Sequence, residues 1–341
     1  MHVFRGQDTS KGIALFPQLC RRLTSYFADG ATLFLINSAQ FGLRNEVCTR
    51  VQLETYLVQG ERMTREEFFA VSSMLELTTK GSFIQWRSPI QSGYAENDIA
   101  AARLFLSPQG WVAPTLVFLH SLMSASDFGY RRIARRLNRA GWNAALVHLP
   151  FHYSRVPRGS INGALALSAN LPRNGETIRQ AVKEVRQLLA LFRKRGCTQF
   201  GLIGTSFGGW IGALVSFLEE DLSYMALLQP VADVENAIWV SPAGEAIRAQ
   251  LEKASIPAGI TRRHAHLTSP MSGRPLIDPD RIRLVGGRFD SIVPLHVLRN
   301  LRDAWPGSRL LEVDQGHFGY AAMGAALREF EALRPQTPTF P

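Results

Sequence analysis

The stretch QFGLIGTSFGGWIGALVSF, residues 199–217, places one serine between two glycines and between two apolar runs. The first run, 200–203, suits a short buried strand, and the second has apolar residues at helical spacing. A strand, a tight turn and a helix are the context in which G-x-S-x-G lifts a serine hydroxyl above the edge of a sheet. Gly204 and Gly208 lack a Cβ, which lets the turn form and the helix approach the strand. We predict that Ser206 is a nucleophile on this turn; an ordinary Gly/Ser-rich loop is the alternative.

The composition indicates a globular protein with a sizeable core. The chain has 341 residues, of which 46% are hydrophobic, so it is long enough for one large α/β domain or two smaller ones. The formal net charge is +10, and arginine-rich runs at 131–136 and 193–195 are typical of solvated helix faces. Such charge would also suit an anionic substrate or an acidic membrane surface. We expect no nucleic-acid partner, because no recognised binding module accompanies the charge.

The cysteines and the amino terminus indicate the compartment. Cys20, Cys48 and Cys197 are widely spaced and odd in number, which favours reduced thiols over a disulfide framework. The first twelve residues lack the apolar run of a secretory signal, and no stretch reaches the length of a membrane span. No cluster of His, Cys and carboxylate residues has metal-ligand spacing. We therefore expect a soluble, cytoplasmic protein with no metal and no cofactor; peripheral membrane contact is the less favoured alternative, and the oligomeric state is not predicted.

From about residue 83 the sequence alternates strand-like and helix-like segments, which predicts an α/β fold: a mostly parallel sheet with helices on both faces. The expected strands cover residues 82–87, 99–106, 115–120, 144–149, 200–203, 224–228, 282–285 and 309–313. The expected helices cover residues 128–140, 176–195, 294–304 and 320–333, besides the helix after Ser206. We expect this domain to span 81–335. Residues 234–278 separate two strands by more than one helix needs, so they are the lid candidate.

The first 80 residues are expected to form a mainly helical extension. Pro17 is tolerated in the first turn of a helix and therefore predicts a helix start. We predict a helix over 17–27 whose Leu19, Leu23 and Phe27 face is buried on the α/β domain. A cap over the active site and a membrane-surface anchor are the alternatives.

Two further reactive side chains follow predicted strands. Asp290 lies in LVGGRFDSIVP and His317 lies in LLEVDQGHFGY, and both should reach the sheet edge where Ser206 lies. An imidazole activates a serine hydroxyl by taking its proton, and a carboxylate orients the imidazole. Asp233 also follows a strand and is the alternative acid, whereas Asp314 is expected to be a loop residue.

These motifs resemble the α/β-hydrolase superfamily over about residues 83–333, with the chain order Ser, Asp, His. The segment LPFHYSRVP at 149–157 is similar to that of bacterial hydrolases and of the α/β-hydrolase domain-containing protein 18 type. The resemblance implies an esterase-like serine hydrolase that acts on a small-molecule acyl substrate: a carboxylic ester or, as less favoured alternatives, a thioester or amide. An acyltransferase with the same triad and a non-catalytic binding or scaffold protein are the alternatives.

The resemblance also implies an oxyanion hole. One donor is the amide of Phe207, directly after the nucleophile. His-Ser-Leu at 120–122 takes the place of a His-Gly-x motif, which makes the Leu122 amide the second donor, with Ser121 in place of the usual glycine.

His152 and Arg155 are expected near the same edge of the sheet. One interpretation is structural: Arg155 pairs with a carboxylate and His152 packs the loop. In the other, Arg155 holds an anionic group of the substrate or orders the lid, which would make Ser121, His152 and Arg155 substrate-side residues.

Overall fold

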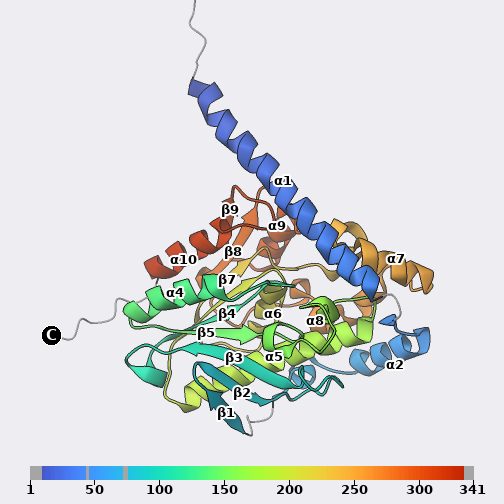
Figure 1. Cartoon of the computed structure of the whole chain (residues 1–341), viewed down its shortest axis with the longest axis horizontal. Helices are drawn as coiled ribbons and strands as arrows, with labels where there is room; N and C mark the ends of the chain where they lie inside the picture. The colour runs from blue at the N-terminus through green and yellow to red at the C-terminus, as the bar shows by residue number, and fades with distance from the viewer. Residues whose placement is uncertain (1–9, 44–45, 72–75, 334–341) are drawn as a thin grey trace, which may run out of the picture.

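The computed structural model describes residues 10–43, 46–71 and 76–333, with side chains from residue 21 onward. In this part of the chain one nine-stranded sheet has the order β1-β2-β3-β5-β4-β6-β7-β8-β9 (Figure 1). The strands are β1 Leu77–Lys80, β2 Phe83–Arg87, β3 Ile99–Phe105, β4 Thr115–Leu119, β5 Asn143–His148, β6 Phe200–Thr205, β7 Leu222–Leu228, β8 Ile282–Gly287 and β9 Arg309–Val313. Strands β4 to β9 pair in parallel, and β1 to β3 add an antiparallel edge that joins β5.

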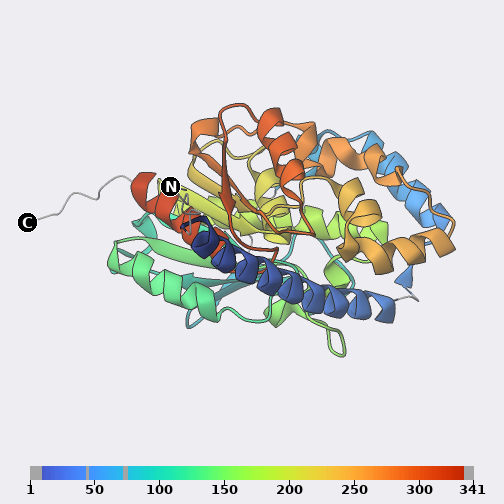
Figure 2. The ribbon, with the colours of Figure 1, turned by 90° about the horizontal axis from the view of Figure 1, so that it is seen from above.

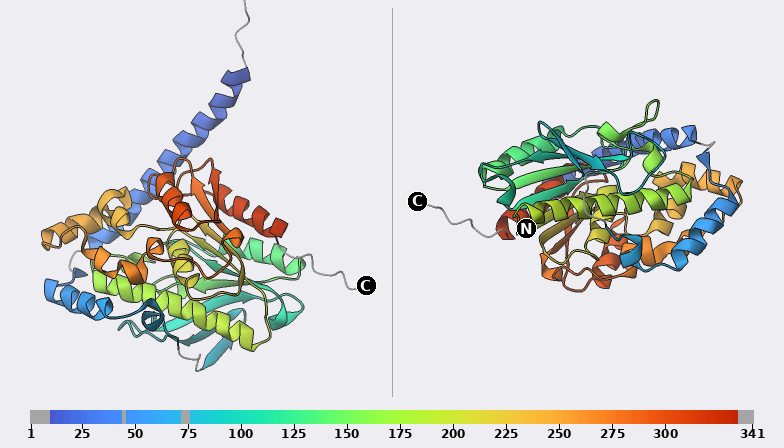
Figure 3. Two further views of the ribbon diagram at one scale, coloured as in Figure 1. Left: turned by 180° about the vertical axis from the view of Figure 1, so that it is seen from behind. Right: turned by 90° about the horizontal axis from the view of Figure 1, so that it is seen from below.

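Helices cover both faces of the sheet. The main helices are α4 Phe128–Arg139, α5 Leu171–Lys194, α6 Phe207–Val215, α9 Leu295–Ala304 and α10 Ala321–Leu333. On β4, Leu116 and Phe118 pack in the core under α4 and α10, whereas Val117 and Leu119 pack in the core under α5, α6 and α9. Because both faces are buried, the central strands are continuous apolar runs. In Figure 3, α5 runs along the back of the molecule.

The predicted α/β architecture is confirmed, with two local differences. Helix α5 begins at Leu171, five residues before the predicted start, because the Asn170 side chain accepts a hydrogen bond from the Arg173 amide and caps an earlier turn. The second difference is β1, which was not expected. It pairs with β2 and extends the antiparallel edge.

The extension is mainly helical, as predicted, but its first helix packs differently. Its helices are α1 Ser10–Gly42, α2 Arg50–Glu61 and α3 Arg65–Phe68. Helix α1 begins before Pro17, and its amino-terminal part projects from the body of the molecule (Figure 1).

The predicted buried face of α1 is wrong. The side chain of Leu23 is 50% exposed and that of Phe27 is 79% exposed. Leu19 precedes residue 21, where the described side chains begin. Ser25 and Asp29 are buried instead, because backbone amides on the domain surface need acceptors there.

Residues 234–278 form short helical segments above the carboxyl edge of the sheet. The principal ones are η5 Asn236–Val240, α7 Glu245–Lys253 and α8 Ala265–Thr268. Within the described residues, the other short turns include η2 Gly110–Val112, η3 Tyr153–Arg155, η4 Ala164–Ala166, η6 Pro242–Gly244, η7 Ile260–His264, η8 Pro270–Ser272 and η9 Pro279–Arg281. Figure 2 shows α1 crossing the molecule and reaching this region.

The extension and the 234–278 segment share one apolar cluster. Leu53 and Leu57 of α2 pack with Ile247 and Leu251 of α7, and Leu171 of α5 joins them. Each segment therefore buries apolar side chains of the other. Among the described helices, none combines the length and hydropathy required to cross a bilayer.

Candidate active site

Ser206 lies on a strained turn between β6 and α6. Its backbone has φ 51° and ψ −110°, a conformation that non-glycine residues rarely adopt. The neighbouring glycines make the turn feasible: a Cβ on Gly204 would lie 2.4 Å from the Gly208 oxygen, and one on Gly208 would lie 2.3 Å from the Leu119 oxygen. The Ser206 amide donates to the Leu228 oxygen, which fixes the turn to β7.

Three of the predicted residues meet at this turn in one hydrogen-bonded chain. Ser206 Oγ lies 2.9 Å from His317 Nε2, and His317 Nδ1 lies 2.8 Å from Asp290 Oδ2. All three side chains are buried, although they are separated by up to 111 positions in the sequence. Because the carboxylate accepts at Nδ1, that nitrogen carries the proton and Nε2 is free to accept one from the serine.

The Asp290 carboxylate is held by four donors. Its Oδ1 accepts from the amides of Ile292 and Val293, both at 2.8 Å. Its Oδ2, besides His317, accepts from Gln229 Nε2 at 2.5 Å. Gln229 also donates to the Gly316 oxygen, so one side chain links the acid to the histidine loop.

Helix α1 holds the other side of the histidine loop. The Asp29 carboxylate accepts from the amides of His317 and Phe318, and Ser25 Oγ accepts from the Gly316 amide at 2.9 Å. Asp29 is 1% exposed, and burial raises the pKa of its carboxyl group. The approach is so close that a Cβ on Gly316 would lie 2.7 Å from Asp29.

Two histidines support the loop after β4. His120 Nε2 accepts from the Leu149 amide, so its Nδ1 donates to the Ser121 oxygen at 2.9 Å. His152 Nε2 accepts from the Met123 amide, and its Nδ1 donates to the Pro150 oxygen at 2.8 Å. Both rings are fully buried, and desolvation lowers the pKa of His152 to about 4, so each is a neutral structural group.

The serine that replaces the usual glycine causes no backbone strain. The left-handed residue of this loop is Met123, with φ 54°, and Ser121 is not among the positive-φ residues. The Gly208 amide donates to the His120 oxygen at 3.1 Å, which ties the loop to the turn of Ser206. Across the described residues, the amides of Phe207 and Leu122 have no protein acceptor.

Comparison with known proteins identifies the fold of the chain. No family model matches the sequence. Acetyl xylan esterases from Paenibacillus sp. R4 and Thermoanaerobacterium sp. superpose with TM-scores of 0.56 and 0.54, at 15% and 13% identity, and each match covers 86% of this chain and 98% of the esterase. An α/β hydrolase from Penicillium sp. superposes with a TM-score of 0.50 at 14% identity, over 77% of this chain and 99% of that one. The chain has the α/β-hydrolase fold.

Relatives by sequence are less informative. An uncharacterized protein in two strains of Mycobacterium tuberculosis is 27% identical over 251 residues, which are 72% of this chain. The match spans 59% of that protein, less than two thirds of its length. The narrower resemblance to the domain-containing protein 18 type stays a prediction.

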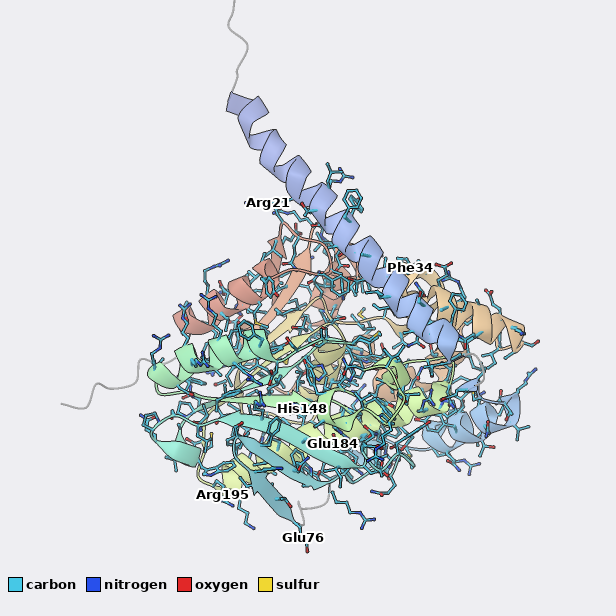
Figure 4. The ribbon with its side chains drawn as sticks, viewed as in Figure 1. Arg21, Phe34, Glu76, His148, Glu184 and Arg195 are labelled. Carbon is cyan, nitrogen blue, oxygen red and sulfur yellow. The ribbon has the colours of Figure 1, made fainter. Side chains whose placement is uncertain are left out.

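Within the α/β-hydrolase fold, Arg155 has a structural position. Its guanidinium is fully buried and donates to both carboxylate oxygens of Glu184 at 2.5 and 2.8 Å, as well as to the backbone oxygens of Asn97 and His148. Figure 4 shows Glu184 and His148 inside the body of the molecule. The structural interpretation, in which Arg155 pairs with a carboxylate, is confirmed. The alternative, in which Arg155 holds an anionic substrate group, is wrong because protein acceptors engage both of its terminal nitrogens, Nη1 and Nη2. The structural interpretation of His152 as a residue that packs the loop is confirmed, and its assignment as a substrate-side residue is wrong, since both of its ring nitrogens bond to backbone groups.

The alternative acids lie outside the hydrogen-bonded chain. Asp233 is exposed, and its Oδ1 accepts from the Asn236 amide at the start of η5. Asp314 pairs with Arg288 on the surface. Only Asp290, of the three acids considered, contacts His317 through its side chain.

A cavity of about 160 Å³ opens beside Ser206 and His317. Its walls come from α1, α2, α5, α6 and the 234–278 segment, so the extension and the lid candidate both border the site. Ser121 and Leu122 also line it.

Three residues that support the site, Gln229, Ser25 and Asp29, were not predicted from the sequence. Gln229 directly follows β7, so the rule that located Ser206 would also have flagged it. Ser25 and Asp29 are polar at i and i+4 and therefore share one face of α1, which is a weak sign of a polar contact. Nothing local indicates that the contact is the histidine loop.

Proposed function

We propose that the protein is a serine hydrolase that cleaves a carboxylic ester through an acyl-enzyme on Ser206. The observation that carries the proposal is the continuous hydrogen-bonded chain from Ser206 Oγ through His317 to Asp290. Ser206 Oγ attacks the carbonyl carbon while its proton passes to His317 Nε2. Asp290 holds the ring in position and stabilises the imidazolium that forms.

The negative charge that develops on the carbonyl oxygen needs donors that are already in place. The amides of Phe207 and Leu122 are the proposed donors, because both are free of protein acceptors and the Gly208–His120 hydrogen bond holds their two segments together. When the intermediate collapses, the leaving oxygen takes the proton from Nε2. Water then attacks the acyl-enzyme, with His317 as the base, and the acid product departs as Ser206 recovers its proton.

A fluorophosphonate probe tests this proposal directly, because it phosphonylates an activated serine. We expect stoichiometric labelling of the native chain at Ser206, located by peptide mass spectrometry. Labelling should vanish in Ser206→Ala and persist in Ser241→Ala, a matched control because Ser241 lines the same cavity but lies outside the hydrogen-bonded chain. No labelling of the folded native protein, or equal labelling of Ser206→Ala, would contradict the proposal.

A further inference from the structure

The walls of the cavity beside Ser206 carry no Asp, Glu, Lys or Arg among the residues that the structure describes. Branched apolar side chains dominate, contributed by segments far apart in the sequence. They include Leu53 and Leu57 from α2, Ile178 from α5, Ile247 from α7 and Ile260 from η7. An ionised group placed here would lose its hydration with no countercharge to compensate, so the walls select against charge.

Most neutral polar groups of the walls already have protein partners. Asn174 accepts from the Ser168 amide and donates to the Ser168 oxygen, Ser241 donates to the Ile292 oxygen, and Thr268 donates to the His264 oxygen. His264 Nε2 contacts the Leu57 oxygen, and burial lowers the pKa of its ring. Among the buried side-chain atoms of the walls, in the part of the chain that the structure describes, Gln40 Oε1 and the Tyr56 hydroxyl lack a hydrogen-bond partner. A polar substrate would therefore find few free partners.

The size of the cavity limits the ligand. An apolar protein cavity of about 150 Å³ holds a benzene molecule, which has six carbons. The volume of about 160 Å³ beside Ser206 is therefore suited to a group of about six carbons. An acetyl group would leave most of it unfilled.

We infer that the substrate is an ester of an uncharged, medium-chain acyl group of about six carbons. The inference rests on the proposed function and names the substrate class of the same site. The acyl group, rather than the alcohol, is assigned to the cavity because it stays bound to Ser206 Oγ after the alcohol departs. Because the walls come from several elements, the cavity can hold the acyl group throughout the reaction. The alcohol and water, which must leave and enter, are assigned to the space outside it.

The excess of arginine does not contradict an uncharged substrate, because the cations lie elsewhere. Arg155 is neutralised by Glu184. The run on α4 lies on the face of the sheet opposite α5, where Arg131, Arg132 and Arg135 are exposed. The basic charge therefore lies on the surface or in buried ion pairs such as Arg155–Glu184, and not on the walls of the cavity.

The test compares kcat/KM for p-nitrophenyl esters with acyl chains of two, four, six, eight and twelve carbons. Each buried methylene contributes about 0.8 kcal/mol, so we expect a rise of about fourfold per carbon up to about six carbons and no further gain beyond eight. The singly charged succinyl ester should react at least about tenfold more slowly than the butyryl ester. A flat profile, a preference for acetyl, or equal succinyl and butyryl rates would overturn the inference.

Two variants test whether the cavity sets the profile. Leu57→Ala should raise the ratio of eight-carbon to six-carbon activity, and Ile247→Phe should move the optimum toward shorter chains. Val58→Ala is the matched control, because Val58 lies beside Leu57 on α2 but is 40% exposed and does not line the cavity. If thermal unfolding shows that Leu57→Ala does not fold, the chain-length profile of Ile247→Phe alone tests the assignment of the cavity. An unchanged profile in the folded variants would overturn the assignment of the cavity.

The two proposals fail in different ways. Loss of all hydrolysis by the native chain, or hydrolysis that survives in Ser206→Ala, contradicts the proposed function. If hydrolysis depends on Ser206 but kcat/KM does not change with the length of the acyl chain, only the proposed substrate class is contradicted. A parallel series that varies the alcohol should show a weaker dependence, and a stronger one would overturn the acyl assignment.

Discussion

The Asp29 carboxylate on α1 accepts the backbone amide of His317, with N–O distances of 3.0 and 2.9 Å. It also accepts the Phe318 amide at 3.2 Å, so one buried side chain holds the loop that presents the imidazole to Ser206. The two residues are 288 positions apart. The extension is therefore part of the framework of the candidate site.

Replacing Asp29 with Ala should disturb the site without removing any group of the hydrogen-bonded chain. The amides of His317, which is buried, and of Phe318, which is partly buried, would lose their acceptor, at a cost of about 1–3 kcal/mol in the free energy of unfolding. We expect kcat to fall on the order of tenfold to a hundredfold with little change in KM, because the histidine is displaced while the cavity remains. Thr32→Ala is the control, since Thr32 bonds only within α1. Native kcat in Asp29→Ala would contradict a positioning role.

Deleting residues 1–80 should give aggregated or poorly expressed protein. The deletion removes Leu53 and Leu57 and thereby exposes Leu171, Ile247 and Leu251, which pack against them. Size-exclusion chromatography of the expressed fragment measures the outcome. A soluble, monomeric and fully active fragment beginning near residue 81 would show that the extension is dispensable.

Ser206→Ala should abolish turnover and leave the fold nearly intact. Loss of the nucleophile in a well-studied serine protease costs about a millionfold in kcat, and we expect a loss of that order. Steady-state hydrolysis and thermal unfolding are the two measurements. A variant that retains a tenth of native hydrolysis would exclude Ser206 as the nucleophile.

Asp290→Asn should cost less than the loss of the serine, on the order of ten-thousandfold in kcat, because the wrong tautomer of His317 would be held. Asp233→Asn is the matched control, since its carboxylate is exposed and contacts only the Asn236 amide among the described groups. If Asp233→Asn proves the crippling change, the acid has been assigned to the wrong residue although the mechanism survives.

The stability of the protein should depend on pH through His152. Burial lowers the pKa of this ring from 6.5 to about 4, so the folded state binds fewer protons than the unfolded state between these values. Its contribution to stability is therefore complete above pH 6.5 and is lost as the pH falls toward 4. Between pH 7.5 and pH 5, His152→Gln should lose about 2 kcal/mol less than the native chain in the free energy of unfolding.

Urea unfolding at the two pH values measures this difference, and His296→Gln, an exposed histidine on α9, is the control. An identical pH dependence in the native chain and in His152→Gln would show that the ring titrates normally.

The α/β fold and the turn at Ser206 could be predicted from local features of the sequence. Apolar runs, helical spacing and sterically required glycines are local properties, and they suffice to predict a strand, a turn and a helix in order. The sequence also indicated that Ser206, Asp290 and His317 follow strands, which is why their meeting at one sheet edge could be predicted from topology alone.

The surroundings of those residues, in contrast, depend on contacts between segments that are far apart in the sequence. Periodicity predicted that Leu23 and Phe27 would be buried, but the adjoining surface presents backbone amides, so Ser25 and Asp29 face it instead. Arg155 forms a buried ion pair with Glu184, because a buried cation requires a countercharge. The guanidinium is therefore not available to a substrate. The walls of the cavity combine α2 with α7. No local pattern specifies such a pairing, since it depends on which apolar surfaces remain uncovered after the sheet and its helices have packed.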